Sequence, residues 1–207
     1  MTLVDNIVYD TKDSAFHQHY GTDNLITNNI FAYPSSLACD LNVSGQCDQA
    51  AIRSSQHMDC GLWAAEDGSG VDYGCNSSFT FEGNIVLLGV EAGGNATKMV
   101  HDTFCVNSHP EVNGLKNMTW GRNVYWSEAY GQESLLDVAF GIRFNPLNFS
   151  EWQKEYKDTG SAVVDPLFVD APGRNFTLLP GSPALAMGFQ NIDVSTVGPR
   201  AKFRRAQ

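Results

Sequence analysis

Four short stretches of the sequence share one pattern, an asparagine followed by a run of β-prone apolar residues. They occupy residues 6–9, 29–32, 84–87 and 123–126. The first two recur with a period in the low twenties, which together with turn residues indicates a stacked β-solenoid. One unit of this kind cannot bury its inner face alone, whereas stacked units share a continuous core. An asparagine repeated at one turn can also hydrogen-bond its counterpart in the next unit, which predicts a ladder of asparagines.

An antiparallel sandwich also has strands that recur with turns between them, but the asparagine at the same place in each stretch favours the solenoid. Helical patterns are scarce. One covers residues 150–158, where Ser150 and Gln153 predict a capping box. The other is "GSPALAMG", with Ser182 as N-cap, Pro183 at the first helical position and Gly188 as the stop. We therefore expect an all-β chain with inserted loops and a short C-terminal capping helix.

Residues 34–78 interrupt the repeats and predict a long loop insertion between units. This segment has glycine-rich turns and no clear repeat of its own. One or two disulfides within it are expected from its four cysteines, and no CxxC spacing favours a zinc knot. Four cysteines allow three connectivities, and any of the five in the chain could be the free thiol. The candidates are Cys39, Cys47, Cys60 and Cys75, with Cys105 left over.

Sequons and charge indicate the compartment and the class of partner. Six Asn-x-Ser/Thr sites occur, whereas chance would supply roughly two. This excess, together with the clustered cysteines, favours a secreted glycoprotein over a chain of reduced thiols. The net charge of −10 argues against a nucleic-acid partner. No apolar run is long enough for a membrane span, and we expect a monomer. The sequons are at Asn42, Asn76, Asn95, Asn117, Asn148 and Asn175.

The N-terminus begins directly in a strand-like pattern, "MTLVDNIVYDTKD", without the basic start and apolar run of a secretory signal. We therefore expect the chain to be the C-terminal part of a longer protein.

Several stretches together resemble the C-terminal half of right-handed parallel β-helix proteins of the pectate-lyase-like superfamily. They are "FHQHYGTDNLITNNIFAY", "SSFTFEGNIV", "NVYW", "FSEWQ" and "VVDPLFVDAPGRNFTLLPGSPALAMGFQNIDVSTVGPR". The resemblance is greatest to large secreted β-helix proteins, some of them glycoside hydrolases that act on fucosides or xylan. It implies one β-helix domain over residues 1–207 and a carbohydrate partner. The cysteine-rich insertion and the missing N-terminal coils depart from the family.

The C-terminal stretch, at about residues 163–200, is interpreted as a closing device. Asp165 and Pro166 begin a strand in which Leu167, Phe168 and Val169 are expected to pack. The helix that follows Ser182 is expected to shield the last open coil, because an uncovered solenoid end is an exposed sheet edge.

Two reactions on a polysaccharide compete. A glycosidase needs two carboxyl groups, about 5–5.5 Å apart for retention or about 6.5–9.5 Å for inversion. Asp10 and Glu82 are the candidate pair: Asp10 ends the first repeat strand, and Glu82 lies two residues before the repeated Asn84. Stacked strands lie about 4.8 Å apart, so carboxylates on neighbouring coils could reach this separation. Asp23 in "YGTDN" is interpreted as a turn former. A lyase would instead need Ca²⁺ or basic residues to neutralise a uronate, and an acidic chain with few Lys and Arg residues favours a neutral glycan.

His17 and His19 would lie on one face of a strand. A zinc site would need a third ligand, so the pair is interpreted either as lining a sugar-binding groove, with an acid/base role, or as structural residues. Candidate platforms for sugar stacking are Tyr20, Trp126 and Trp63, with core packing the alternative for Trp126.

The sequence thus predicts hydrolysis of glycosidic bonds by Asp10 and Glu82, with His17 and His19 lining the site and no cofactor. The alternatives are a calcium-assisted polysaccharide lyase and a non-catalytic, glycan-binding or cell-surface solenoid.

Overall fold

Short strands recur in groups of three in the computed structural model, which describes residues 1–11, 14–18, 23–34, 50–54, 79–89, 98–102, 118–128, 140–142 and 145–197. We call each group a unit. Unit 1 contains β1 (Thr2–Val4), β2 (Ile7–Tyr9) and β3 (Phe16–Gln18), and unit 2 contains β4 (Asn24–Thr27), β5 (Ile30–Ala32) and β6 (Ala50–Ser54). Unit 3 contains β7 (Phe79–Glu82), β8 (Ile85–Leu88) and β9 (Lys98–Asp102), and unit 4 contains β10 (Met118–Gly121), β11 (Val124–Ser127) and β12 (Phe140–Ile142).

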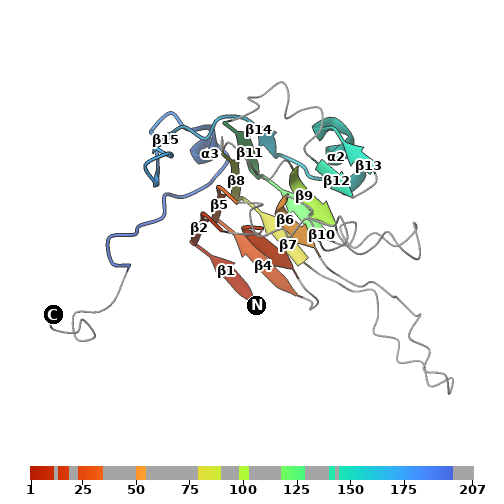
Figure 1. The fold of residues 1–207 in the computed structure, drawn as a ribbon, viewed down its shortest axis with the longest axis horizontal. Helices are drawn as coiled ribbons and strands as arrows, with labels where there is room; N and C mark the ends of the chain where they lie inside the picture. The colour runs from red at the N-terminus through yellow and green to blue at the C-terminus, as the bar shows by residue number, and fades with distance from the viewer. Residues whose placement is uncertain are drawn as a thin grey trace, which may run out of the picture.

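Each strand pairs in parallel with its counterpart in the next unit, which produces three sheets. The first sheet is β1-β4-β7-β10, and the second is β2-β5-β8-β11 followed by β14 (Ala162–Val163). The third is β3-β6-β9-β12, with β13 (Asn145–Leu147) antiparallel at its edge. Figure 1 shows the progression from the red strands of unit 1 through yellow to green in unit 4. The described chain is thus mostly strands in parallel sheets with few helices, as the sequence predicts at this coarse level.

The two central strands of the second sheet, β5 and β8, are covered on both faces. All residues of β5 and β8 are buried. Phe31 and Val86 face an interior apolar cluster between the sheets, whereas Ile30 and Ile85 belong to a second cluster outside it. A strand covered on both faces has no polar alternation, and this explains the uninterrupted apolar runs after the repeated asparagines. In the first sheet, by contrast, β7 alternates between buried and half-buried residues.

The repeated asparagines form the predicted ladder at the turn between the first and second sheets. Asn84 Oδ1 accepts hydrogen bonds from the backbone N and from Nδ2 of Asn29, both at 3.0 Å. In the same way, Asn123 Oδ1 accepts a hydrogen bond from the Asn84 backbone N at 2.9 Å. Asn29 Oδ1 accepts one from the Asn6 backbone N, also at 2.9 Å. Asn29, Asn84 and Asn123 are fully buried. The ladder therefore satisfies buried polar groups that would otherwise be costly.

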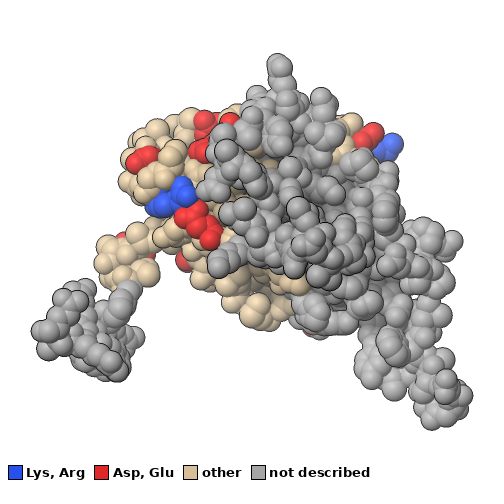
Figure 2. Space-filling model, viewed as in Figure 1, with Lys and Arg blue, Asp and Glu red and all other residues tan. Residues whose placement is uncertain are grey.

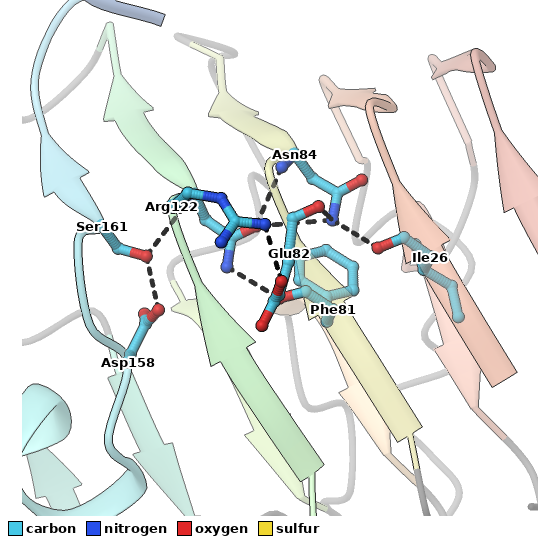
Figure 3. Close-up of polar contacts among 8 residues, drawn as sticks. Ile26, Phe81, Glu82, Asn84, Arg122, Asp158 and Ser161 are labelled. Carbon is cyan, nitrogen blue, oxygen red and sulfur yellow. Dashed lines mark hydrogen bonds and ion pairs between the residues drawn. The ribbon is translucent and has the colours of Figure 1, made fainter. Parts of the chain in front are cut away.

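A carboxylate terminates the ladder. Ser161 Oγ accepts a hydrogen bond from the Asn123 backbone N at 2.8 Å. The same hydroxyl donates a hydrogen bond to Asp158, as Figure 3 shows. Asp158 also accepts from the Tyr125 hydroxyl and from Trp152 Nε1, each at 2.9 Å. Asp158 is fully buried, and this burial raises the pKa of its carboxyl although the hydrogen bonds oppose the shift.

Helix α2 (Phe149–Tyr156) covers the unit 4 end of the interior cluster. Its Trp152 is fully buried and packs edge-on against Trp120, with ring centroids 5.2 Å apart. The predicted capping box at Ser150 and Gln153 is wrong: the N-cap is Asn148, and its box partner is Glu151. No helix in the described part of the chain is long and apolar enough to cross a membrane.

The C-terminal segment packs along the side of the second sheet, where it forms β15 (Phe168–Asp170), β16 (Asn175–Leu178) and α3 (Pro183–Ala186). The Phe176 ring lies 5.5 Å from that of Tyr9 in unit 1 and 6.1 Å from that of Tyr33 in unit 2. The expectation that this segment shields the last coil is therefore wrong, because α2 covers that end and the segment covers a side.

The local predictions for the C-terminal segment are partly correct. Ser182 caps α3, Pro183 begins it and Gly188 follows its end with φ of 99°. Of the three residues expected to pack, Phe168 does, but Leu167 and Val169 are 38% and 49% exposed.

One strand lies within the predicted loop insertion at residues 34–78. The residues of β6, Ala50–Ser54, pair with β3 and β9, and Ile52 is 1% exposed in the interior cluster. The insertion is therefore interrupted by the third-sheet strand of unit 2. The five cysteines, together with Asn42, Asn76, Asn95 and Asn117, lie outside the described residues.

Candidate functional site

The structure distributes the predicted site residues over three sheets. Glu82 ends β7 in the first sheet, Asp10 follows β2 in the second sheet, and His17 is an exposed residue of β3 in the third sheet. His19, Tyr20 and Trp63 lie outside the described residues. Trp126 is half-buried near the end of β11. A single site that contains all the described candidates is thus not formed.

Asp10 and Glu82 do not face each other. They lie two units apart, which is about 10 Å along the stack, and they end strands of different sheets. Each is engaged by an arginine: Arg174 Nη2 lies 2.6 Å from Asp10 Oδ1, and Arg122 Nη2 lies 2.7 Å from Glu82 Oε2. The expectation that these two carboxylates flank one glycosidic bond is therefore wrong.

Among the described residues, no group of three or more His, Cys, Asp or Glu side chains is arranged to hold a metal ion. Asp23 has φ of 57°, as is typical of the turn predicted for it. Two sequon asparagines are described. Asn148 is half-buried at the start of α2, and Asn175 is exposed at the start of β16.

A cavity of about 280 Å³ lies between the end of β11 and the segment that leads into β15. We call it the β11–β15 cleft. Trp126 and Glu128 contribute from the β11 side, two residues apart, so both side chains point to one face. The other side contributes Asp165 and Asp170. The remaining lining residues are Leu87, Pro166, Phe168, Val169, Ala171 and Pro172.

The two aspartates of the cleft also shape its backbone. Asp165 Oδ1 accepts a hydrogen bond from the Leu167 backbone N at 2.8 Å, and Asp170 Oδ1 accepts one from the Gly173 backbone N at 3.1 Å. Gly173 is needed at this turn, because a Cβ there would lie 2.1 Å from Asp170 Oδ2. One oxygen of each carboxylate thus holds a turn of the chain.

Glu128 is fixed from the other side by Tyr33. The Tyr33 hydroxyl donates a hydrogen bond to Glu128 Oε1 at 2.9 Å. Burial raises the pKa of the Tyr33 hydroxyl, and the hydrogen bond and charge of Glu128 raise it further, so the hydroxyl keeps its proton. The guanidinium carbon of Arg174 lies 4.2 Å from the centroid of the Tyr33 ring. Asp10 is part of this arrangement, because it is the carboxylate that binds Arg174.

The cleft is acidic. Three of its lining residues have carboxylate side chains, and none of the lining residues is Lys or Arg. The nearby guanidinium of Arg174 binds Asp10 through two nitrogens, at 2.8 and 2.6 Å. Figure 2 shows acidic side chains gathered over the region of β15, with a basic group beside them. The arrangement combines an aromatic wall with acids, which suits a neutral or amine-bearing ligand better than an anion.

Of the cleft residues, the sequence identified Trp126 but not Glu128, Asp165 or Asp170. A signal for Glu128 was present, because it lies two residues beyond Trp126 at the end of a strand and so shares its face. Asp165 and Asp170 are in the stretch interpreted as a closing device, and their proximity to β11 depends on how that stretch folds back.

Comparison of the chain with protein-family models, with curated proteins and with solved structures finds no significant match.

Proposed function

We propose that the chain is a right-handed parallel β-helix in which each unit is one coil, and that it is secreted, glycosylated and monomeric. Two observations support the fold. The register between counterpart strands is constant, with Ile7, Ile30 and Ile85 opposite one another. The asparagine ladder repeats at one corner of successive units, as expected for stacked coils. The excess of sequons supports secretion.

We propose further that the protein is carbohydrate-active and hydrolyses glycosidic bonds at the β11–β15 cleft. The observation that carries this proposal is the presence of Trp126 and three carboxylates in one cavity. An aromatic face buries the apolar C–H face of a pyranose. Two carboxyl groups then supply the general acid and the base or nucleophile. In this proposal Glu128 is one of the pair, and Asp165 or Asp170 is the other.

A neutral glycan is the substrate that the charge of the cleft favours. A lyase must neutralise a uronate, and the acidic lining would repel such a polymer unless Ca²⁺ intervened. Non-catalytic glycan binding is the second candidate, and a specific observation favours it. Asp165 and Asp170 each accept a hydrogen bond from a turn of the backbone, which is a sufficient structural role for both.

The test is release of reducing ends from a panel of neutral polysaccharides and oligosaccharides. Glu128→Gln removes the ionisable group and should lower kcat about a thousandfold. Trp126→Ala should raise KM about tenfold through lost stacking, and Trp126→Phe should restore most of the difference. Glu82→Gln is the matched control, because Glu82 is also a carboxylate bound by a neighbouring side chain but lies outside the cleft.

The outcomes separate the candidate functions. Binding of a glycan that depends on Trp126 but shows no turnover would establish the non-catalytic alternative. Products that absorb in the ultraviolet and vanish with a chelator would establish the lyase. Full activity in Glu128→Gln would remove the cleft from consideration as the catalytic site.

A further inference from the structure

Tyr33 reaches Glu128 across an intervening unit. Tyr33 follows β5 in unit 2, whereas Glu128 follows β11 in unit 4. The residue of unit 3 at this place is Gly89, and a Cβ there would lie 2.4 Å from Cδ1 of the Tyr33 ring. No side chain larger than a hydrogen atom would fit beneath the ring. The absence of a side chain at Gly89 is therefore what allows the contact between Tyr33 and Glu128.

The backbone of Tyr33 adopts an unfavourable conformation. Its φ is 52°, in the left-handed region that a bulky aromatic residue rarely adopts. Such a conformation persists where the surroundings impose it. Asp10, at the same place in unit 1, has φ of 53°, so this corner of the units imposes it on both residues. The ring is only 8% exposed and is held between Gly89 and the guanidinium of Arg174. Arg174 is itself fixed by its two hydrogen bonds to Asp10.

We propose that Tyr33 is a positioning residue, which holds the carboxylate of Glu128 in one orientation within the β11–β15 cleft; this inference rests on the proposed function. The Tyr33 hydroxyl donates its hydrogen bond to Oε1 of Glu128, so that Oε2 is left to contact the sugar. Glu128 is exposed, so without this hydrogen bond its side chain is free to take other rotamers. Asp10 and Arg174 hold Tyr33 in place from the opposite side.

The test is Tyr33→Phe, which keeps the ring and its packing and removes the hydroxyl. Misplacement of a reacting group lowers the rate more than it lowers binding, so kcat should fall about tenfold while KM changes less than about twofold. Gly89→Ala should give the same pattern, because its Cβ displaces the ring. Tyr9→Phe is the matched control. Tyr9 also packs against Phe176 on the outer face of the second sheet, but it lies in unit 1 and does not line the cleft.

A second measurement does not need a substrate. Burial raises the pKa of the Tyr33 hydroxyl too far for it to be titrated in the folded protein, but the hydrogen bond from this hydroxyl to Glu128 Oε1 can be followed at neutral pH. The ¹³Cζ resonance of labelled Tyr33 should therefore shift in Glu128→Gln, which replaces the charged acceptor, and should not shift in Glu82→Gln. A wild-type protein that turns over no glycan would contradict the proposed function alone. An unchanged Tyr33 ¹³Cζ chemical shift in Glu128→Gln, or unchanged kcat in Tyr33→Phe with an active wild type, would overturn the positioning role.

Discussion

At the scale of single residues, the asparagines of the ladder are distinguished by how many hydrogen bonds each one completes. Asn84 accepts two from Asn29, and its Nδ2 donates to the carbonyl oxygens of Ile26 and Glu82 at 3.0 and 3.2 Å. Asn6, at the start of the ladder, is half-buried and donates to Asn29 and to Val4. The energetic importance of the same residue type therefore depends on its place in the stack.

Replacement of Asn84 by alanine should lower the free energy of unfolding by about 3 kcal/mol, because it leaves buried donors and acceptors without partners. Asn6→Ala should cost about 1 kcal/mol, since water can satisfy the groups that it exposes. Urea unfolding of the two variants measures both values. Equal losses would show that burial along the ladder does not set its contribution.

At the scale of elements, α2 shows how a capping pattern can be assigned to the wrong residues. "NFSEWQ" contains two overlapping candidates, Asn148 with Glu151 and Ser150 with Gln153. The structure uses the first pair: Glu151 N donates to Asn148 Oδ1 at 2.9 Å, and Glu151 Oε2 accepts from Asn148 N at 3.0 Å. Gln153 instead donates to the carbonyl oxygens of Asp158 and Ser161, at 3.2 Å each.

Asn148→Ala should destabilise the protein by about 1 kcal/mol through loss of the N-cap. Ser150→Ala should change stability by less than about 0.5 kcal/mol, because Ser150 is an exposed residue inside the helix. The pair is well matched, since each substitution also removes the same sequon. Thermal unfolding distinguishes them, and a larger loss in Ser150→Ala would favour the alternative cap.

At the scale of the whole molecule, Asp158 joins three parts of the fold: β11 through Tyr125, α2 through Trp152, and the ladder through Ser161. Because burial raises the pKa of Asp158 in the folded state above 3.8, the folded protein binds a proton that the unfolded chain has already released. The contribution of Asp158 to stability is therefore lost as pH rises from about 3.8 through the raised folded-state pKa.

Asp158→Asn should flatten the fall in stability with pH over this mildly acidic range, as measured by urea unfolding at a series of pH values. Asp193→Asn is the control. Hydrogen bonds from Ser195 lower the pKa of Asp193, so its titration falls below the range and should leave the slope unchanged. A slope that Asp158→Asn does not alter would assign the pH dependence to other groups.

The repeats, the asparagine ladder and α3 could be predicted because each depends on residues close in sequence or on one pattern used several times. The strand at residues 50–54 could not, since a segment with cysteines and glycine-rich turns shows no local repeat, and only pairing with β3 and β9 defines it. In the sequence, Asp10 follows one apolar repeat and Glu82 precedes another. Which sheet each strand joins, and which arginine lies opposite, is decided by contacts between distant residues.

The sequence by itself determined that short strands recur with a buried asparagine before each apolar run, because these are properties of local hydrogen bonding and of side-chain alternation. Only the tertiary structure decided that the C-terminal segment folds back along the second sheet. That packing places Asp165 and Asp170 beside Trp126 and Glu128, and it joins Arg174 to Asp10 across 164 residues of chain. The cleft follows from this packing because apolar groups such as Phe176 bury against whichever face is left uncovered, and no local pattern specifies that face.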